Sequence, residues 1–363
     1  MGRGTLASHD AARRPLTARP RAENSLRVRN LGQRGERLGD YELLERIGVG
    51  GMAEVWRGRH VSEQGFERPL AVKRILPHLA ADPEFVGMFV DEAKLAVQLS
   101  HPNIASVHDL GRAGDTCYLV LDYVHGRDLR LLQDREREWG APPHAGIACH
   151  VIARTLEGLS YAHEATDAVG RPLGLIHRDV TPQNLLVSFE GDVKIVDFGL
   201  AKAQGRAQAT QAGVVKGKLA YLAPEQLRGV PLDPRVDVYA AGIVLWELLT
   251  GARLFYADTD LDTIRKVHAG VVEPPSRLNA SIPPQLDQVV LTALERDRDA
   301  RFQSAQAFLD ALEEVIWEWG VAYTAPQIGA YVAHFFPEAL ETSRVVGDEP
   351  SAVLDADDLE EIA

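Results

Sequence analysis

The feature that most constrains the fold is a change of hydrophobic pattern near Gly126. Between residues 41 and 123 the apolar residues fall into short runs rich in β-branched and aromatic side chains, which are typical of strands. One longer stretch in this part, residues 83–99, carries its apolar residues at helical spacing. After Gly126 helical spacing dominates. A small strand-rich part followed by a larger helical part predicts an α+β protein with two lobes.

The same pattern gives approximate bounds for the individual elements. The predicted strands cover residues 41–48, 53–60, 69–75, 104–109 and 117–123. The predicted helices of the second part cover residues 145–163, 236–249, 286–295 and 304–319. We therefore expect a smaller lobe over residues 41–123 and a larger lobe over residues 124–319.

The two ends of the chain differ from the middle in charge. Residues 1–40 hold nine arginines, four acids and few apolar residues, which predicts a disordered basic arm. Residues 320–363 form a C-terminal extension. From Pro337 onward it holds nine acids and one arginine, so we expect it to end as a solvated acidic tail.

Composition narrows the class of protein. The 363 residues carry a net charge of −13, whereas a generic nucleic-acid-binding protein is usually basic. Two cysteines are too few for a disulfide framework or a zinc cluster. No apolar stretch approaches the roughly 18 residues of a membrane helix, and no secretory signal opens the sequence. We expect a soluble, cytoplasmic protein with no nucleic-acid partner and no membrane span.

The first residues that suggest chemistry are glycines between two predicted strands. Gly48, Gly50 and Gly51 lack a Cβ, so backbone amides there can approach a phosphate closely. An ordinary glycine-rich hairpin would look the same. Lys73 ends a later strand and can reach a phosphate if a carboxylate holds it, and Glu92 in the helix of residues 83–99 is a candidate for that carboxylate.

Two later loops carry acids and an amide beside short apolar strands. Asp179 and Asn184 lie in the first loop, and Asp197 lies in the second. Carboxylate and amide oxygens are the ligands that Mg²⁺ prefers. A further aspartate can accept the proton of an attacking hydroxyl. The two loops therefore predict a site for metal binding and proton transfer.

Taken in order, these motifs resemble the signature set of the protein kinases. The set comprises the glycine loop, Lys73, Glu92, His177-Arg178-Asp179, Asp197-Phe198-Gly199 and Ala223-Pro224-Glu225. The chain resembles the eukaryotic-like (Hanks-type) serine/threonine protein kinases and looks like a bacterial, soluble member. The resemblance covers about residues 38 to 312. It implies a bilobal fold, with an antiparallel sheet and one helix in the N-lobe and a mainly helical C-lobe.

The resemblance also implies roles for individual residues. The residues that would surround ATP are Ile47, Gly48, Val49, Gly50, Gly51, Met52, Ala53, Glu54, Val55, Ala71, Lys73, Leu121, Asp122, Val124 and Leu186. Lys73, held by Glu92, would bind phosphates, and Asp179 would take the proton of the acceptor hydroxyl. Asn184 and Asp197 would hold Mg²⁺, with Mn²⁺ as a substitute. Two architectural contacts would follow: Asp237 bracing the His-Arg-Asp backbone, and Arg301 pairing with Glu225.

Two positions depart from the family pattern. Serine/threonine kinases usually carry lysine two residues after the catalytic aspartate, where this chain has Thr181. They usually carry threonine after the glycine that precedes Ala-Pro-Glu, where this chain has Lys218. Our hypothesis is that Lys218 supplies the catalytic cation from the opposite side of the site. The alternative is that Lys218 is a solvated loop lysine and Thr181 a neutral replacement.

The resemblance further implies substrate class and regulation. The residues after Asp179 keep the proline found in serine/threonine-directed kinases, so we expect protein serine or threonine acceptors. Arg178 would bind a phosphorylated activation loop, and Thr210 is the best candidate for that phosphate. Autophosphorylation in trans would require a transient homodimer. The alternatives are a pseudokinase scaffold, favoured by Thr181 and Ala53, and a small-molecule kinase on the same fold.

Overall fold

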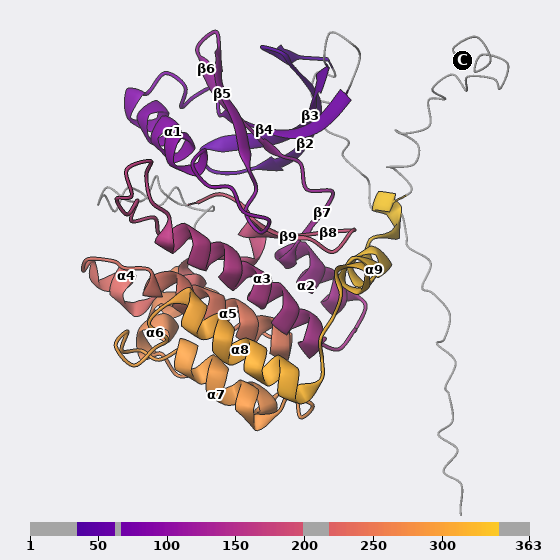
Figure 1. The fold of residues 1–363 in the computed structure, drawn as a ribbon, viewed down its shortest axis with the longest axis vertical. Coiled ribbons are helices and arrows are strands. Elements are labelled where there is room, and N and C mark those ends of the chain that lie inside the picture. The colour runs from indigo at the N-terminus through magenta and orange to yellow at the C-terminus, as the bar shows by residue number, and fades with distance from the viewer. Residues whose placement is uncertain (1–34, 62–66, 199–217, 341–363) are drawn as a thin grey trace, which may run out of the picture.

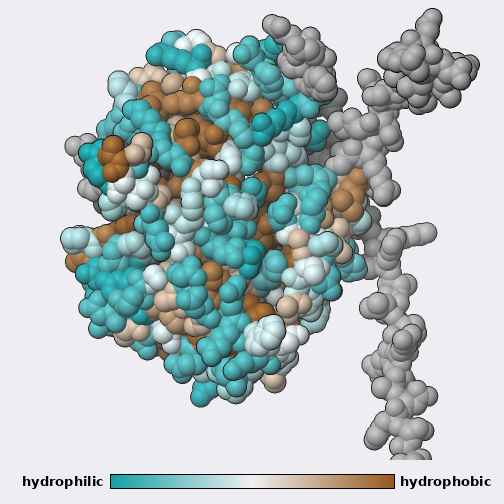
Figure 2. Space-filling model, viewed as in Figure 1, coloured by the Kyte–Doolittle hydropathy of each residue, from teal (hydrophilic) through white to brown (hydrophobic). Residues whose placement is uncertain are grey.

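The structure is a computed structural model, and it describes residues 35–61, 67–198 and 218–340. Its elements form two lobes, one built around a sheet and one built of helices (Figure 1). The predicted α+β class is therefore confirmed. In the face shown in Figure 2, hydrophilic residues cover most of the helical lobe, and apolar residues reach the surface mainly over the sheet of the other lobe.

The N-lobe is an antiparallel sheet of six strands with one helix. The strand order is β1-β2-β3-β4-β6-β5. The strands are β1 (Arg37–Leu38), β2 (Tyr41–Val49), β3 (Ala53–Val61), β4 (Glu67–Ile75), β5 (Val107–Ala113) and β6 (Thr116–Asp122). The helix α1 (Pro83–Ala96) begins at Asp82, whose side chain accepts a hydrogen bond from the Glu84 amide. Helix α1 contacts β5.

Successive side chains of β4 point to opposite faces of the sheet, so the charged Lys73 follows the core residue Val72 but faces the other way. Leu70 and Val72 point into a buried cluster with Leu43 and Trp56 on one face of the sheet. Lys73 follows Val72 and therefore points to the other face, toward α1. The strand pattern thus directs the ammonium group of Lys73 away from the buried cluster and toward Glu92 of α1.

Before α9, the described part of the C-lobe holds seven α-helices, with α5 among them, and, in its later part, two short 3₁₀ turns. They are α2 (Leu129–Glu138), α3 (Ala145–Glu164), η3 (Lys218–Tyr221), α4 (Pro224–Arg228), α5 (Arg235–Thr250), α6 (Asp260–Ala269), η4 (Pro275–Arg277), α7 (Pro284–Ala293) and α8 (Ala305–Trp319). Nearly every side chain of α5 is buried, because α3, α7 and α8 all contact it. Such a helix is apolar all round rather than on one stripe.

A second sheet of three strands lies between the helices and the N-lobe. It pairs β7 (Gly126–Asp128), β8 (Leu185–Ser188) and β9 (Val193–Ile195) antiparallel, and the 3₁₀ turn η1 (Pro182–Asn184) precedes β8. The predicted strand over residues 104–109 is wrong in its first half. Ile104 instead forms a bridge with Ile195, because the Ala105 amide donates to the Ile195 carbonyl.

Both predicted domain boundaries need correction where the structure describes them. The basic arm was predicted to extend to residue 40, but Leu38 of β1 is buried in the sheet and Glu36 forms an ion pair with Arg74. The remainder of the arm, residues 1–34, and the acidic tail from residue 341 lie outside the described residues.

The C-terminal extension also starts as part of the C-lobe. Its helix α9 (Ala325–Phe335) contacts α2 and β8, and it buries Ile328, Val332 and Phe335 in the main hydrophobic cluster. The helix lies very close to the turn between β8 and β9. A Cβ on Gly329 would collide with the Phe189 carbonyl, and a Cβ on Gly191 would collide with the Ala325 carbonyl. Backbone therefore packs directly on backbone at this contact.

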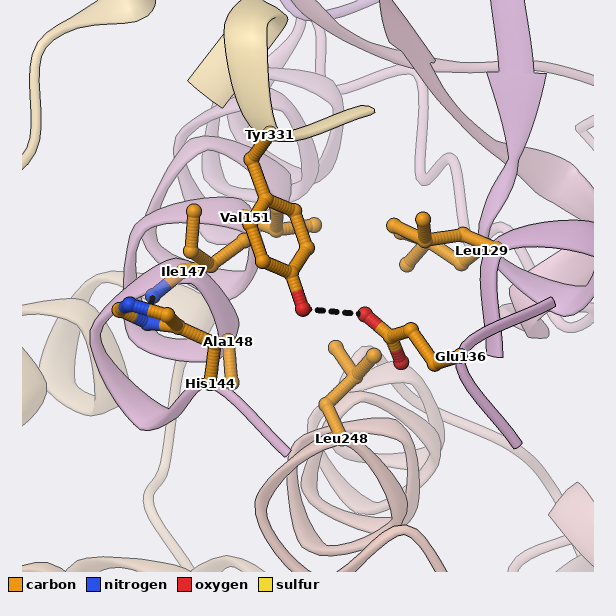
Figure 3. A pocket seen from close by; sticks show the side chains of 9 residues that line it. Leu129, Glu136, His144, Ile147, Ala148, Val151, Leu248 and Tyr331 are labelled. Carbon is orange, nitrogen blue, oxygen red and sulfur yellow. Dashed lines mark hydrogen bonds between the residues drawn. The ribbon is translucent and has the colours of Figure 1, made fainter. Parts of the chain in front are cut away.

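A small cavity of about 10 Å³ lies under α9 (Figure 3). Most of its lining is apolar and comes from α2, α3 and α5. The Tyr331 hydroxyl points into it from α9 and donates a hydrogen bond of 2.7 Å to Glu136 of α2. Burial raises the pKa of Glu136, an effect that the Tyr331 hydrogen bond partly offsets.

We predict that Tyr331→Phe lowers the free energy of unfolding by about 1 kcal/mol at pH 7, because it leaves the partly buried Glu136 carboxylate without this donor. A carboxyl group whose pKa is raised by folding destabilises the protein only when ionised, so the loss shrinks as the pH falls toward 4.5. Urea denaturation at pH 7 and pH 4.5 measures both values. A loss that is equal at the two pH values would contradict the assignment.

Candidate active site

Lys73 forms the contact that joins the two lobes. Its ammonium lies 3.0 Å from Glu92 of α1 and 2.8 Å from Asp197, two residues after β9. The predicted Lys73–Glu92 pair is confirmed. The contact with Asp197 adds the candidate metal ligand to the same group, so residues far apart in the sequence meet at one cation.

Burial and neighbouring charges shift the pKa values of Lys73 and Asp197 in opposite directions. Burial alone would lower the pKa of Lys73, but the adjacent Asp197 and Glu92 carboxylates raise it overall. Burial alone would raise the pKa of Asp197, yet the Lys73 ammonium holds it below its usual value. Burial does raise the pKa of Glu92. Lys73 is therefore a fixed positive charge that keeps Asp197 ionised.

The loop that carries Asp179 is held by a buried carboxylate on α5. Asp237 is fully buried and accepts hydrogen bonds from the backbone amides of His177 and Arg178, at 2.8 and 2.7 Å. His163 of α3 contributes a third hydrogen bond, at 2.8 Å. The predicted brace is thus present, and the histidine that completes it was not predicted.

His177 positions Asp179 through its own ring. Burial lowers the pKa of His177, so the ring is neutral. One ring nitrogen, Nε2, lies 3.1 Å from the Val196 carbonyl, which assigns its proton there. The other, Nδ1, accepts the Asp179 amide at 3.2 Å. The ring therefore connects the loop of Asp179 with the segment that leads to Asp197.

Two strained residues mark the same place. Among the described non-glycine residues, Arg178 and Asp197 have positive φ angles, of 64° and 57°. Such backbone persists only where its surroundings fix it, and it concentrates at functional sites. Here the hydrogen bonds of Asp237 and the ion pair with Lys73 supply that support.

Asn184 and Asp197 have the chemistry to hold a divalent cation. The Asn184 amide nitrogen donates to the Asp179 carbonyl and to its carboxylate, at 2.8 and 3.1 Å, so its two protons are used and its oxygen remains as a donor to metal. Asp197 uses Oδ1 for Lys73, and 42 % of its side chain is exposed. Two oxygen donors at the mouth of a site fit a hard divalent cation.

Lys218, at the start of η3, reaches the same aspartate. Its ammonium lies 2.5 Å from Asp179 Oδ2. Thr181 is almost fully buried, and its hydroxyl has no hydrogen-bond partner among the described residues. The structure therefore places a lysine on Asp179 from the later segment, while the loop itself offers a neutral side chain.

The residues predicted to surround ATP fall on β2, β3 and the turn between them, on β4 and β6, on the connection after β6 (Val124) and on β8 (Leu186). Ile47 and Val49 are 48 % and 61 % exposed, as expected for the roof of an open cleft. Glu54 is an exception to the prediction. Its carboxylate bonds Arg74 at 2.7 Å on the opposite face of the sheet, because alternation turns it away from Val55 and Lys73. Only the backbone of Glu54 is available to a nucleotide.

Asp122, at the end of β6, has its side chain turned away from the expected adenine site. The carboxylate accepts the Ser106 amide at 3.0 Å and contacts His108 at 2.7 Å and Lys194 of β9 at 3.7 Å. Its own amide donates to the Ser106 carbonyl. These partners were not predicted, because no local pattern links residues so far apart.

Two buried networks fix the segment that follows Lys218. Arg301 binds both oxygens of Glu225, at 2.6 and 2.8 Å, which confirms the predicted pair. The Tyr221 hydroxyl donates to Glu247 at 2.7 Å and accepts from Arg130 at 2.6 Å, a network that was not predicted. Thr210, the predicted phosphorylation site, lies outside the described residues. Within the described part, no helix is long and apolar enough to cross a membrane.

Comparison with known proteins agrees with this geometry. The family described as "Protein kinase domain" matches residues 41–311. A relative named tyrosine-protein kinase MasK, from Myxococcus xanthus, is 39 % identical over 309 residues, which are 84 % of this chain and 47 % of MasK. The serine/threonine-protein kinase PknL of Mycobacterium tuberculosis is 37 % identical over 279 residues, which are 77 % of this chain and 66 % of PknL.

A solved structure resembles the whole bilobal core. The kinase domain of Mycobacterium tuberculosis PknI aligns with a TM-score of 0.58 and 28 % identity, covering 77 % of this chain and 98 % of that domain. The present chain spans less than two thirds of the length of the curated relatives named above.

We predict that Asp237→Asn lowers the free energy of unfolding by about 3 kcal/mol at pH 7. The buried Asp237 carboxylate accepts three hydrogen bonds, and the single oxygen of a neutral amide cannot accept all of them in the same geometry. Burial opposes ionisation of Asp237, but the His163 hydrogen bond holds its pKa below the usual 3.8. A lowered pKa stabilises the folded state above pH 3.8 and loses this effect as the pH falls below it. Denaturation of both proteins from pH 7 to pH 3 should show the difference narrowing only below about pH 4.

Proposed function

Because the chain belongs to the protein kinase family, we propose that it transfers the γ-phosphoryl group of ATP to serine and threonine hydroxyls of proteins. The observation that carries this proposal is the convergence of Lys73, Asp179, Asn184 and Asp197 from both lobes. A scaffold without catalytic activity would have no use for a cation, a base and two metal ligands in one place. We therefore favour an enzyme over a pseudokinase, and the cytoplasm, where ATP is available, as its location.

Each of these residues has a distinct task in the proposed reaction. Lys73 would bind the phosphates of ATP, since its charge is fixed between Glu92 and Asp197. Asp179 would orient the acceptor hydroxyl and take its proton. Asn184 and Asp197 would hold Mg²⁺, or Mn²⁺ in its place. The bound cation would neutralise charge on the phosphates during in-line transfer.

The acceptor class has two candidates. The name of PknL and the proline after Thr181 favour serine and threonine. The name of MasK, at 39 % identity, favours tyrosine as a second candidate. Two peptides that differ only in a serine or a tyrosine at one position separate the two, with acid hydrolysis of the labelled protein to identify the phosphoamino acid.

We predict that Asp179→Asn lowers kcat by about 10² to 10⁴-fold, because it removes the base. Lys73→Met should lower kcat/KM for ATP by about 10² to 10³-fold, because it removes a fixed charge from the phosphates. Asp91→Asn and Lys94→Met are matched controls, since these two residues form an exposed ion pair on α1. Transfer of labelled phosphate measures all four variants. Activity of both site variants equal to that of the controls would exclude the proposed function.

We also propose that Thr210 is autophosphorylated, in trans through a transient homodimer, and that Arg178 binds the phosphate. The Arg178 Nε is buried with no partner among the described residues, which leaves it available to an anion. Peptide mapping after incubation with ATP should find phosphate on Thr210, and the modification rate should rise with protein concentration. Full activity with unmodified Thr210 would contradict this regulation.

A further inference from the structure

We propose that Lys218 is a catalytic residue that supplies the positive charge on the acceptor side of the reaction, and that it makes Asp179 competent only when the segment Lys218–Tyr221 is seated on the C-lobe. This inference rests on the proposed phosphoryl transfer. It extends that function by naming the group that links the activation segment to the base.

The contact itself is short and direct. The Lys218 ammonium lies 2.5 Å from Asp179 Oδ2, and the same carboxylate oxygen accepts the Asn184 amide at 3.1 Å. An ammonium group has three N–H donors, and one of them donates a hydrogen bond to Asp179. The side chain of Lys218 remains 39 % exposed, so its other protons can face an incoming substrate.

The C-lobe side of the site needs a positive charge that the other residues described there do not supply. Lys73 is engaged by Glu92 and Asp197, and it lies on the N-lobe side of the site. On the C-lobe side, Asp179 brings a negative charge close to the position of a highly charged phosphoryl donor. Thr181 carries no charge there, and its buried hydroxyl has no partner among the described residues. Lys218 is positioned to offset the repulsion between this carboxylate and the phosphates.

The position of Lys218 is set by the C-lobe and not by the loop of Asp179. Three residues after it, Tyr221 is anchored to Glu247 of α5 and Arg130 of α2. Four residues further on, Glu225 is fixed by the buried Arg301. A lysine within the Asp179 loop would remain near the base whatever the later segment did. A lysine on η3 reaches Asp179 only when η3 occupies its place.

The chemistry balances without a change in the charge of Lys218. The acceptor oxygen forms a bond to the γ-phosphorus as the bond from that phosphorus to the β,γ-bridging oxygen breaks, and ADP leaves with that electron pair. The acceptor proton goes to Asp179. The Lys218 ammonium keeps its protons and donates hydrogen bonds to Asp179 and to a phosphoryl oxygen, where one such donor accounts for about 10² to 10³-fold in rate.

Chemical restoration of the ammonium group gives a direct test. The native cysteines, Cys117 and Cys149, are both buried, so a cysteine introduced by Lys218→Cys is the reactive one. We expect this variant to lose about 10² to 10³-fold in kcat with its ATP dissociation constant within a factor of three of the unmodified protein. Alkylation with 2-bromoethylamine rebuilds an ammonium side chain and should restore at least a tenth of the original kcat. Alkylation with iodoacetamide, which adds a neutral group, should restore nothing.

A double-mutant cycle tests whether the charge can be moved between the two positions. Lys218→Thr should be as impaired as Lys218→Cys, and adding Thr181→Lys to it should recover activity that Lys218→Thr alone lacks. Lys94→Met is the matched control for loss of a lysine charge, and thermal unfolding with and without ATP reports folding and nucleotide binding in every variant.

Several results would overturn the proposal. Full activity of Lys218→Cys would do so, and so would equal recovery with both alkylating reagents. A large loss of ATP affinity that accounts for the whole loss of activity would also do so. If the double variant does not fold, the alkylation result decides. Failure of the proposed function is a separate outcome, because then the unmodified protein transfers no phosphate to any acceptor, whereas failure of this inference leaves an active enzyme indifferent to residue 218.

Discussion

The ion pairs of Lys73 are the interaction on which the rest of the site depends. One ammonium group is shared by Glu92 of α1 and Asp197 beyond β9, and it thereby joins the N-lobe sheet, the N-lobe helix and the C-lobe. A buried charge needs such partners, because its desolvation is otherwise too costly. Removing any member leaves the others uncompensated. The relative position of the lobes is thus tied to the group that meets the phosphates.

A second buried charge does the same for the catalytic loop. Asp237 stands on α5, the helix at the centre of the C-lobe, and it fixes the backbone that ends at Asp179. The strained φ angle of Arg178 is held by this carboxylate. The loop of Asp179 therefore takes its geometry from α5, a helix that is almost entirely buried. The position of Asp179 in the site thus depends on the buried charge of Asp237.

Much of this could be predicted from the sequence, because the information was local or carried by motifs. Periodicity located the longer strands of the N-lobe and the helices α1, α3, α5, α7 and α8 to within a few residues, but not α2, α4, α6, α9 or the short strands. The order of motifs identified Lys73, Glu92, Asp179, Asn184 and Asp197. The partners of Asp122, the role of His163 and the Tyr221–Glu247–Arg130 network were missed, because each joins distant elements without a periodic signal. The direction of the Glu54 side chain did not follow from its place in the glycine-loop motif, because strand alternation decides which side chains face the cleft.

The packing of α9 has a consequence for where this domain ends. The family match stops at residue 311, yet the backbone of α9 lies directly on the turn that joins β8 and β9, between the two strands next to Asn184 and Asp197. A polypeptide cut at residue 311 would uncover the apolar surface on which Ile328, Val332 and Phe335 rest. It would also lose the support behind that turn. The packed C-lobe is therefore longer than the family match, and its last described helix lies directly behind the strands that lead to the site.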